Sequence, residues 1–473
     1  MTLLADLALT YGTPAYVYDL QMIRSAHADL RAALPSGAEL YYSVKANPHP
    51  QVIACLAGLG CRTEVASCGE LDAALAAGVA PERILLTAPA KSESTVLNAL
   101  ARRVTHFSVD SPTDLARIAG QAERIGVPAD CLLRVNADQA VPGMGLSMTG
   151  TASQFGADAS WILREPHLFQ GHDMARVTGL HLYMGTNIGE QERLLRQFTI
   201  GVELAAELRA SLGDHLRTID LGGGFGTPFA RSGERPVFPA LATELASVLD
   251  GGLPGWRDGD ITVAFESGRY LTGDCGHLLT TVLDTKESKG TRFTVLDTGI
   301  HHLGGMSGLR RVPPVSPDVI RAAETDDHGS THAYEADPRA TRPYEPDPRP
   351  THPYEPDPRP THANRPGTRT ASDVESQQPG VLAGPLCTPL DTLSRNIPLP
   401  AMDTGDVLAI PNVGAYGLSA SLVAFLGHAL PVEIVLDGGH VVSASRLRMT
   451  RDPVDPEANG PSYPVHHTEG VHA

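Results

Sequence analysis

Residues 38–51 read AELYYSVKANPHPQ, and this stretch shows the pattern from which the fold is predicted. A β-rich run from Glu39 to Val44 is followed by one cation, Lys45, and then by a Pro-His-Pro turn. Residues at the ends of strands contact ligands more often than they support a core. The position of Lys45 therefore indicates a chemical role.

Seven further β-rich runs follow, and each is separated from the next by a segment long enough for a helix. Residues 69–79 are rich in Ala and Leu and end near a Gly, and residues 111–126 offer Ser111 or Thr113 as an N-cap. Eight strand–helix units between about Glu39 and Arg269 predict a (β/α)8 barrel. The runs are AELYYSV (38–44), CRTEVAS (61–67), RILLTA (83–88), VTHFSVD (104–110), CLLRVN (131–136), VTGLHLYM (177–184), RTIDLGG (217–223) and ITVAFES (261–267).

After Arg269 the pattern changes to β-branched segments that are broken by Gly and Asp and have no helical separators, as in TRFTVLDTGI (291–300) and EIVLDGGHVVSAS (433–445). This pattern predicts a β domain, either a sandwich or a barrel. We expect the barrel over residues 20–270 and the β domain over residues 271–315 and 379–473. The segment PAYVYDL (14–20) has the same character, so residues 1–19 are expected to add an N-terminal strand to the β domain.

A ten-residue repeat interrupts the predicted β domain: THAYEADPRA, TRPYEPDPRP and THPYEPDPRP follow one another from Thr331 to Pro360. Proline favours extended segments, and the few apolar groups cannot offset the entropy lost on ordering. We therefore predict that residues 316–378 are a disordered insertion in a loop. Both a role in recognition and a neutral low-complexity expansion remain open for the repeats.

The composition limits the class of protein. A chain of 473 residues is longer than one core usually supports, and its formal charge of -17 argues against general binding of nucleic acid or anionic lipid. The cysteines are scattered, which predicts no disulfide framework and no zinc site, and reduced thiols fit a cytoplasmic protein. The N-terminus lacks a basic n-region, and the most apolar stretch (419–436) contains His, Pro and Glu, so neither a signal peptide nor a membrane span is expected. The cysteines are Cys55, Cys61, Cys68, Cys131, Cys275 and Cys387.

Unusual polar residues lie at or near the carboxyl ends of the predicted strands, where barrel enzymes build their active sites. A Lys and an Arg can bind an anion, successive glycines allow it to approach the backbone, and a Glu can face a cationic nitrogen. Pyridoxal 5'-phosphate needs an amine, a phosphate cradle and an acid, so we predict this cofactor. The residues are Lys45, Glu64, Ser67, Arg134, His181, Tyr183, DLGGGFG (220–226) and FESGR (265–269).

Several motifs in order along the chain resemble those of the fold type III pyridoxal-phosphate decarboxylases, the family of ornithine, arginine and diaminopimelate decarboxylases. The resemblance implies an alanine racemase-like fold, in which a (β/α)8 barrel is followed by a β domain. It covers the chain from about Thr13 to beyond Arg446, except for the repeats. The motifs are YSVKAN (42–47), GEL (69–71), LRVN (133–136), GGGF (222–225), ESGR (266–269), GPLC with a following Asp (384–391) and GAY (414–416).

The resemblance also implies roles for individual residues. Lys45 would hold the cofactor covalently, Glu266 would form a salt bridge with its pyridinium nitrogen, and Cys387 would reach the active site of a second subunit and help to reprotonate Cα. Asp391 would support the same interface site. A homodimer with shared active sites is therefore implied. The remaining cofactor-binding residues would be Arg134, Tyr183, Gly222, Gly223, Gly224, Gly268, Arg269 and Tyr416.

Two departures from the family pattern concern the substrate. Tyr183 stands where many members have a His stacked on the cofactor ring, and nearby His181 is expected to be either a polar residue near the substrate or a core histidine. Thr388 stands where decarboxylases of dibasic amino acids carry an acidic residue that binds the distal ammonium group. We therefore expect a substrate that is not dibasic.

The string GPLCTPLD (384–391) and the segment LDTGIHHLGGMSG (296–308), with His301 and His302, look closer to a biosynthetic branch of the family that acts on carrier-linked or acyl-linked amino acids. A metal site at the paired histidines lacks a third ligand, and no metal is expected. Three alternatives stay open: a diaminopimelate decarboxylase proper, an amino-acid racemase and a non-catalytic pyridoxal-phosphate-binding protein. The GPLC and ESGR motifs speak against a racemase, and the large β domain speaks against a non-catalytic carrier.

Overall fold

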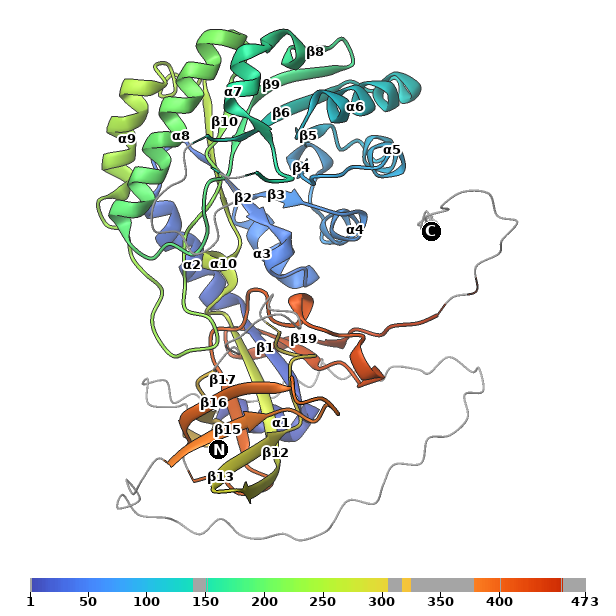
Figure 1. Cartoon of the computed structure of the whole chain (residues 1–473), viewed down its shortest axis with the longest axis vertical. Helices are drawn as coiled ribbons and strands as arrows, with labels where there is room; N and C mark the ends of the chain where they lie inside the picture. The colour runs from blue at the N-terminus through green and yellow to red at the C-terminus, as the bar shows by residue number, and fades with distance from the viewer. Residues whose placement is uncertain are drawn as a thin grey trace, which may run out of the picture.

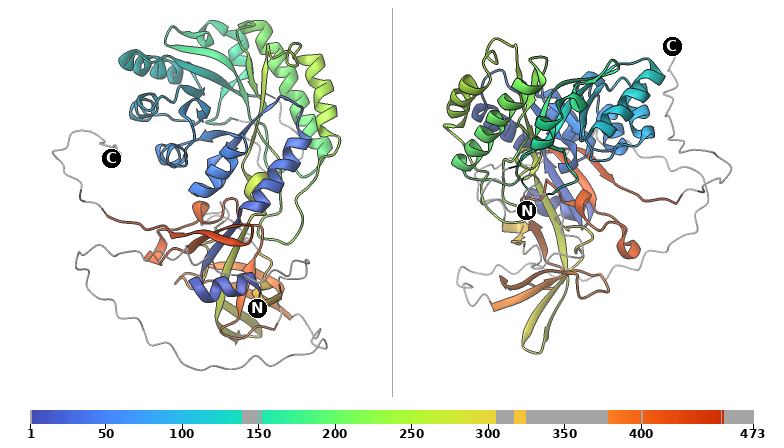
Figure 2. Two further views of the ribbon diagram at one scale, coloured as in Figure 1. Left: turned by 180° about the vertical axis from the view of Figure 1, so that it is seen from behind. Right: turned by 45° about the horizontal axis from the view of Figure 1, so that its top comes forward.

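The computed structural model describes residues 2–138, 150, 152–304, 317–324, 378–399, 401–451 and 453. These residues form a barrel and a mixed β-sheet domain, which lie at opposite ends of the long axis of the molecule (Figures 1 and 2). Each of the two parts contains one of the two large sheets. The prediction of a (β/α)8 barrel followed by a β domain is confirmed.

The barrel closes because β6 (Ala129–Asn136) pairs with β9 (Ala175–Leu182), in addition to the pairings between neighbouring strands of the sheet. Its eight core strands are parallel to one another. Six of them fall within the predicted runs, and the strands of the fifth and sixth runs each begin two residues earlier than predicted, at Ala129 and Ala175. Two short strands, β7 (Ala157–Asp158) and β8 (Gly171–His172), extend the sheet. The core strands are β2 (Glu39–Ser43), β3 (Arg62–Val65), β4 (Ile84–Leu86), β5 (His106–Val109), β6 (Ala129–Asn136), β9 (Ala175–Leu182), β10 (Thr218–Asp220) and β11 (Thr262–Ser267).

Helices connect the barrel strands, and their first residues follow the capping rules. The hydroxyl of Ser67 caps α4 by accepting a hydrogen bond from the amide of Glu70, and Ser111, rather than Thr113, caps α6 in the same way. Long helices α8 and α9 lie side by side outside the barrel (Figure 1). The helices are α2 (Leu20–Ala33), α3 (Pro50–Gly58), α4 (Cys68–Ala76), α5 (Glu93–Ala101), α6 (Pro112–Ile125), α7 (Ala159–Arg164), α8 (Gln191–Leu212), α9 (Leu241–Gly252) and α10 (Arg269–Thr272), with 3-10 turns η1 (Val44–Ala46), η2 (Pro81–Arg83) and η3 (Pro166–Phe169).

The second domain is a mixed sheet in which the described strands follow the order β16-β15-β13-β12-β1-β18-β19, with β17 paired to β12 and β14. Strand β1 (Ala15–Asp19) runs antiparallel to β12 and parallel to β18, so a segment from the start of the chain lies inside a sheet made mostly of its end. The other strands are β12 (Gly276–Ser288), β13 (Thr291–Leu296), β14 (Ile320–Arg321), β15 (Gln378–Ala383), β16 (Thr392–Leu399), β17 (Val407–Ile410), β18 (Val432–Asp437) and β19 (His440–Arg446).

The N-terminus and the insertion differ in part from the predictions. Residues 1–19 were predicted as a strand, but Leu3–Tyr11 form helix α1, whose first turn is capped by Thr2, and α1 packs Leu7 and Ala8 against the sheet. Disorder was predicted for 316–378, but β14 and the 3-10 turn η5 (Ala322–Glu324) are ordered because β14 pairs with β17. The repeats at 331–360 lie outside the described residues.

One large hydrophobic cluster fills the space between the barrel strands and the helices. A separate small cluster of Tyr41, Leu85, Leu132 and Ala264 lies on the opposite face of the strands, inside the barrel, and two further clusters lie on the sheet domain. Tyr16 and Tyr18 of β1 belong to the large cluster, so apolar packing continues from the sheet domain into the barrel. Within the described ranges, no helix has both the length and the apolar character needed to cross a membrane.

Candidate active site

A cavity opens at the carboxyl ends of β2, β9, β10 and β11, which is where the sequence predicted the chemistry. Its walls come from five separate segments that only the closed barrel and the sheet domain bring together. The lining residues are Ser43, Lys45, Tyr183, Thr186, Gly223, Gly224, Phe225, Glu266, Ser267, Gly268, Arg269 and Tyr416.

Lys45 follows β2 directly, in the turn η1, and its side chain remains 41% exposed. Its Nζ lies 3.0 and 3.2 Å from the two carboxylate oxygens of Glu64, which stands on the neighbouring strand β3. Burial opposes the charge on Lys45, but the carboxylates of Glu64 and Glu266 outweigh it and raise the pKa of the amine. Without a cofactor, the lysine is therefore a cation held by Glu64.

Glycines form the part of the wall where a ligand could approach the backbone. A Cβ atom at Gly223 would lie 2.7 Å from the carbonyl oxygen of Glu266, and one at Gly268 would lie 2.7 Å from Cβ of Ala46. Gly222 and Gly224 have φ values of +69° and +127°, which side chains rarely allow. A turn with these conformations exposes backbone amides to an anion such as a phosphate group.

A cation and a phenol close the same end of the cavity. Arg269 begins α10 directly after Gly268, and its guanidinium lies 4.7 Å from the centre of the Tyr416 ring. Tyr416 comes from the loop after β17, where its amide donates to the carbonyl oxygen of Ala46 at 2.8 Å. The sheet domain therefore completes a wall of the barrel site.

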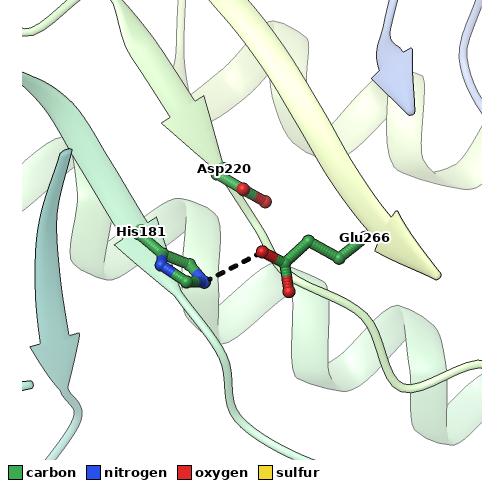
Figure 3. Close-up of side chains that lie close together, drawn as sticks. All are labelled: His181, Asp220 and Glu266. Carbon is green, nitrogen blue, oxygen red and sulfur yellow. Dashed lines mark ion pairs between the residues drawn. The ribbon is translucent and has the colours of Figure 1, made fainter. Parts of the chain in front are cut away.

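Glu266 on β11 lines the cavity and is 1% exposed. Behind it, Nε2 of His181 lies 3.3 Å from Oε1 of Glu266, and Asp220 of β10 stands beside both (Figure 3). Among the described residues, these three are the one group of His, Cys, Asp or Glu side chains whose geometry could hold a metal ion. A buried carboxylate at the cavity wall could instead face a cationic ring nitrogen.

The other predicted site residues do not all line this cavity. Tyr183 does, with its ring centre 5.9 Å from Nζ of Lys45. Arg134 pairs in register with His181 inside the barrel, and its guanidinium lies 4.7 Å from the centre of the Phe155 ring. His181 is 1% exposed and lies behind the wall. It remains a prediction that Arg134 contacts the cofactor and that His181 contacts the substrate.

The residues of the GPLC segment lie in the sheet domain and do not line the cavity of their own chain. Cys387 is exposed. Asp391 is 3% exposed, and its two oxygens accept hydrogen bonds from the amides of Ile300 and Leu386, each at 2.8 Å. This carboxylate therefore fixes the loop that carries Cys387 and Thr388. Substrate-binding roles for Thr388 and Asp391 stay predictions.

Several lining or supporting residues had no role in the sequence analysis. Ser267 has a buried hydroxyl without a hydrogen-bond partner, and Ser43 and Thr186 also line the cavity. Glu64 was noted as polar, but its pairing with Lys45 was not predicted. The available signal was its place on the strand next to the lysine, because parallel pairing aligns Ser43 with Glu64.

These residues fit pyridoxal phosphate. The amine of Lys45 can react with an aldehyde, the glycine turn with Arg269 and Tyr416 suits a phosphate group, and the buried Glu266 can partner the ring nitrogen. The buried hydroxyl of Ser267, which also lines the cavity, lacks a hydrogen-bond partner, and such a ligand would supply one.

Comparison with known proteins gives the same assignment. A protein from Niallia circulans named L-glutamyl-[BtrI acyl-carrier protein] decarboxylase is 29% identical over 429 residues, which covers 91% of this chain and 90% of that protein. A diaminopimelate decarboxylase from Zymomonas mobilis is 26% identical and covers 92% of this chain and 90% of its own length. A crystal structure of diaminopimelate decarboxylase from Helicobacter pylori complexed with L-lysine shares the fold, with a TM-score of 0.70, 23% identity and coverage of 91% of this chain and 93% of that one.

Family comparison covers both parts of the structure. Residues 20–273 match the pyridoxal binding domain of the pyridoxal-dependent decarboxylases, and residues 349–414 match their C-terminal sheet domain. The first match alone spans more than half of the chain. The chain therefore belongs to the pyridoxal-dependent decarboxylases of ornithine, diaminopimelate and arginine, and it is a pyridoxal phosphate-dependent amino-acid decarboxylase.

Proposed function

We propose that the enzyme decarboxylates an amino acid that has no distal ammonium group and is joined to a carrier protein or another acyl group. The observation that carries the proposal is Thr388, which follows Cys387 and offers no negative charge. A relative named L-glutamyl-[BtrI acyl-carrier protein] decarboxylase supports the carrier-linked substrate.

The charge missing at Thr388 sets the expected selectivity. A carboxylate that receives an ammonium group contributes about 1.5 to 3 kcal/mol through a charge-assisted hydrogen bond. At about 1.4 kcal/mol per factor of ten, an enzyme with Thr at this position loses roughly 10- to 150-fold in preference for a dibasic substrate. Free ornithine, lysine and diaminopimelate are therefore expected to be poor substrates.

Within the cavity, we assign each residue one task. When bound, pyridoxal phosphate supplies a ring that accepts the electron pair released at Cα as carbon dioxide leaves. Gly222, Gly223, Gly224, Arg269 and Tyr416 hold its phosphate.

Two further groups complete the proposed chemistry. Glu266 keeps a negative charge beside the ring nitrogen, and Tyr183 provides an aromatic face beside the ring. Because Lys45 lies at the cavity, its Nζ would hold the cofactor, and this amine is the alternative to Cys387 as the group that returns a proton to Cα.

A second subunit completes the proposed site. Cys387 is exposed and does not line the cavity of its own chain, so we assign it to the cavity of a partner in a homodimer. There, its Sγ would donate the proton that Cα takes up after carbon dioxide leaves. Asp391 would act through the loop, because its carboxylate fixes the backbone next to Cys387.

A second candidate is diaminopimelate decarboxylase activity. It is favoured by relatives of that name from Zymomonas mobilis and Helicobacter pylori, each 26% identical to this chain. The same cavity would serve both substrates, because only the group beyond Cα differs. Thr388 argues against this candidate.

The deciding experiment measures carbon dioxide release by the holoenzyme. Substrates are glutamate joined through its side-chain carboxyl group to an acyl-carrier protein, so that the α-carboxylate is free to leave, the same amino acid free, and free diaminopimelate, ornithine and lysine. Preference for the carrier-linked substrate supports the proposal, whereas efficient turnover of free diaminopimelate overturns it. Thr388→Glu is expected to raise turnover of the dibasic amino acids, and Thr388→Val serves as the matched uncharged control.

A further inference from the structure

We propose that His181 and Asp220 are positioning residues for Glu266, and that the three side chains form a buried cluster that shares protons behind the wall of the cavity. The inference rests on the proposed role of Glu266 as the partner of the ring nitrogen. It adds two residues that touch neither the substrate nor the cofactor but control the group that does.

The cluster is built by three adjacent strands of the barrel. Parallel pairing sets Asp220 of β10 opposite His181 of β9, and Glu266 extends from β11 on the other side of β10. The three side chains place one ligand atom each within 4.8 Å of the others, and they converge in Figure 3. Barrel closure therefore brings an imidazole and two carboxyl groups into one small buried space.

Each of the two positioning residues, His181 and Asp220, is also held by a contact with a residue outside the cluster. Nδ1 of His181 lies 2.8 Å from the hydroxyl of Ser108, and this contact leaves Nε2 directed to Oε1 of Glu266. One oxygen of Asp220 accepts a hydrogen bond from the amide of Gly222 at 2.9 Å. Asp220 thus also links the cluster to the first glycine of the phosphate turn.

Each of the three side chains has one buried polar atom without a hydrogen-bond partner, and protons shared within the cluster would satisfy these atoms. Oδ2 of Asp220, Oε1 of Glu266 and Nε2 of His181 are buried and have no hydrogen-bond partner by strict geometry. Two carboxylates cannot both be ionised at this separation in a buried site without strong repulsion. The cluster therefore retains protons at neutral pH.

The proton positions follow from the surrounding charges. Burial opposes the charge on His181, but the adjacent carboxylate of Glu266 raises the pKa of the imidazole above its usual value. Burial, followed by repulsion from Glu266, raises the pKa of Asp220 to about 8. These shifts favour protons on His181 and on Asp220, the two groups that flank the carboxyl group of Glu266.

Other titratable groups face the cluster from the remaining strands. Arg134 on β6 opposes protonation of His181, and Glu64 on β3 further raises the pKa of Asp220. The charge of Glu266 also contributes to raising the pKa values of Tyr41 on β2 and of Lys45 after β2. Among the described residues, none of these four groups forms an ion pair with Glu266, whereas Nε2 of His181 does. In the part of the chain that the structure describes, His181 is therefore the side chain that pairs directly with Glu266.

Substitutions in the holoenzyme test this assignment. His181→Gln keeps a side chain that can donate a hydrogen bond but cannot carry charge, and His172→Gln, at an exposed residue of β8, is the matched control. We expect His181→Gln to lower kcat by about tenfold with KM unchanged, because Glu266 loses the charged partner that orients its carboxylate. It should also shift the pH dependence of the absorbance of the bound cofactor, whereas the control should do neither.

Asp220→Asn supplies the second variant. In the cofactor-free protein, the contribution of Asp220 to the free energy of unfolding should fall between about pH 4 and pH 8 for the wild type, because folded Asp220, with its pKa raised to about 8, binds its proton more tightly than the unfolded residue does. In Asp220→Asn this decline should be smaller. A folded His181→Gln enzyme with an unchanged pH profile and unchanged absorbance would overturn the inference, as would an Asp220→Asn protein with the wild-type decline.

Two controls separate this inference from the proposed function. If Glu266→Gln leaves both activity and absorbance unchanged, the proposed role of Glu266 itself fails. If Glu266→Gln is impaired while His181→Gln is not, only the positioning role fails. Stoichiometric Zn²⁺ binding by the cofactor-free protein that is lost in all three variants would also overturn the inference, by assigning the cluster to a metal.

Discussion

Replacing Glu64 with Gln tests how the cavity holds Lys45 before the cofactor binds. Glu64 is 4% exposed, and it accepts hydrogen bonds from Lys45 at 3.0 Å and from the hydroxyl of Thr87 at 2.6 Å. Burial alone would raise the pKa of this carboxyl, but the charge of Lys45 and the hydrogen bonds of Ser43, Thr87 and Lys45 lower it to about 2. Gln keeps the shape of the side chain and removes the charge.

The magnitude follows from the pKa difference. An ordinary value of 4.5 against about 2 corresponds to about 3.4 kcal/mol at about 1.4 kcal/mol per pKa unit. Because the Lys45 side chain is 41% exposed, solvent screening reduces this to about 2 kcal/mol. The pKa of Glu64 is lowered in the folded state, so its contribution is present above about pH 4.5 and is lost as the pH falls towards 2.

The assay is urea unfolding of the cofactor-free protein at pH 7 and at pH 4. Glu64→Gln is expected to lower the free energy of unfolding by about 2 kcal/mol at pH 7 and to lose less stability than the wild type on acidification. Asp250→Asn, which removes an exposed partner of Arg257, is the matched control and should change little. Equal stability of Glu64→Gln and wild type at pH 7, with equal loss at pH 4, would refute the reasoning.

Three further substitutions test other parts of the structure. Cys387→Ala should lower kcat with little change in stability, and mixing Cys387→Ala with Lys45→Ala subunits should restore part of the activity; no recovery would contradict a site shared between subunits. Gly223→Ala should weaken the affinity for pyridoxal phosphate by at least about tenfold, because its Cβ would lie 2.7 Å from the carbonyl oxygen of Glu266; a spectroscopic titration that gave wild-type affinity would exclude a tight turn there. Lys91→Met should lower the free energy of unfolding by about 3 to 5 kcal/mol, because Asp110 loses its cation and Asp114 keeps only Arg117, and a loss below about 1 kcal/mol in urea unfolding would contradict a stabilising role for the buried lysine.

Local sequence signals were sufficient to predict the barrel and the main wall of the cavity. Lys45 and Glu266 lie at strand ends, and the glycines after Asp220 mark a turn, so each could be recognised within its own segment. Helix α1 was missed because its apolar residues lie close to a strand-like run. The sequence also placed the start of the insertion too early, since the pairing of β14 with β17 depends on residues far along the chain.

Contacts between strands could not be predicted in the same way. Glu64 faces Lys45 because β2 and β3 pair in one particular register, and Asp220 meets His181 because β9 and β10 do. A shift of one residue would turn each side chain to the opposite face of its strand. Polar residues within a strand therefore gave no signal of their own until the barrel fixed their neighbours.

The charges around the cavity are arranged as two neutral groups. Lys45 and Glu64 form one pair at the rim, and His181 and Glu266 form another behind the wall, with a neutral Asp220 beside it. Burying this many ionisable groups is tolerable because each charge has a partner and Asp220 keeps its proton. Pyridoxal phosphate would be held at Lys45, whose partner is Glu64, whereas its ring nitrogen would face Glu266, whose partner is His181. The amine that reacts and the carboxylate that would face the ring nitrogen therefore have different direct partners.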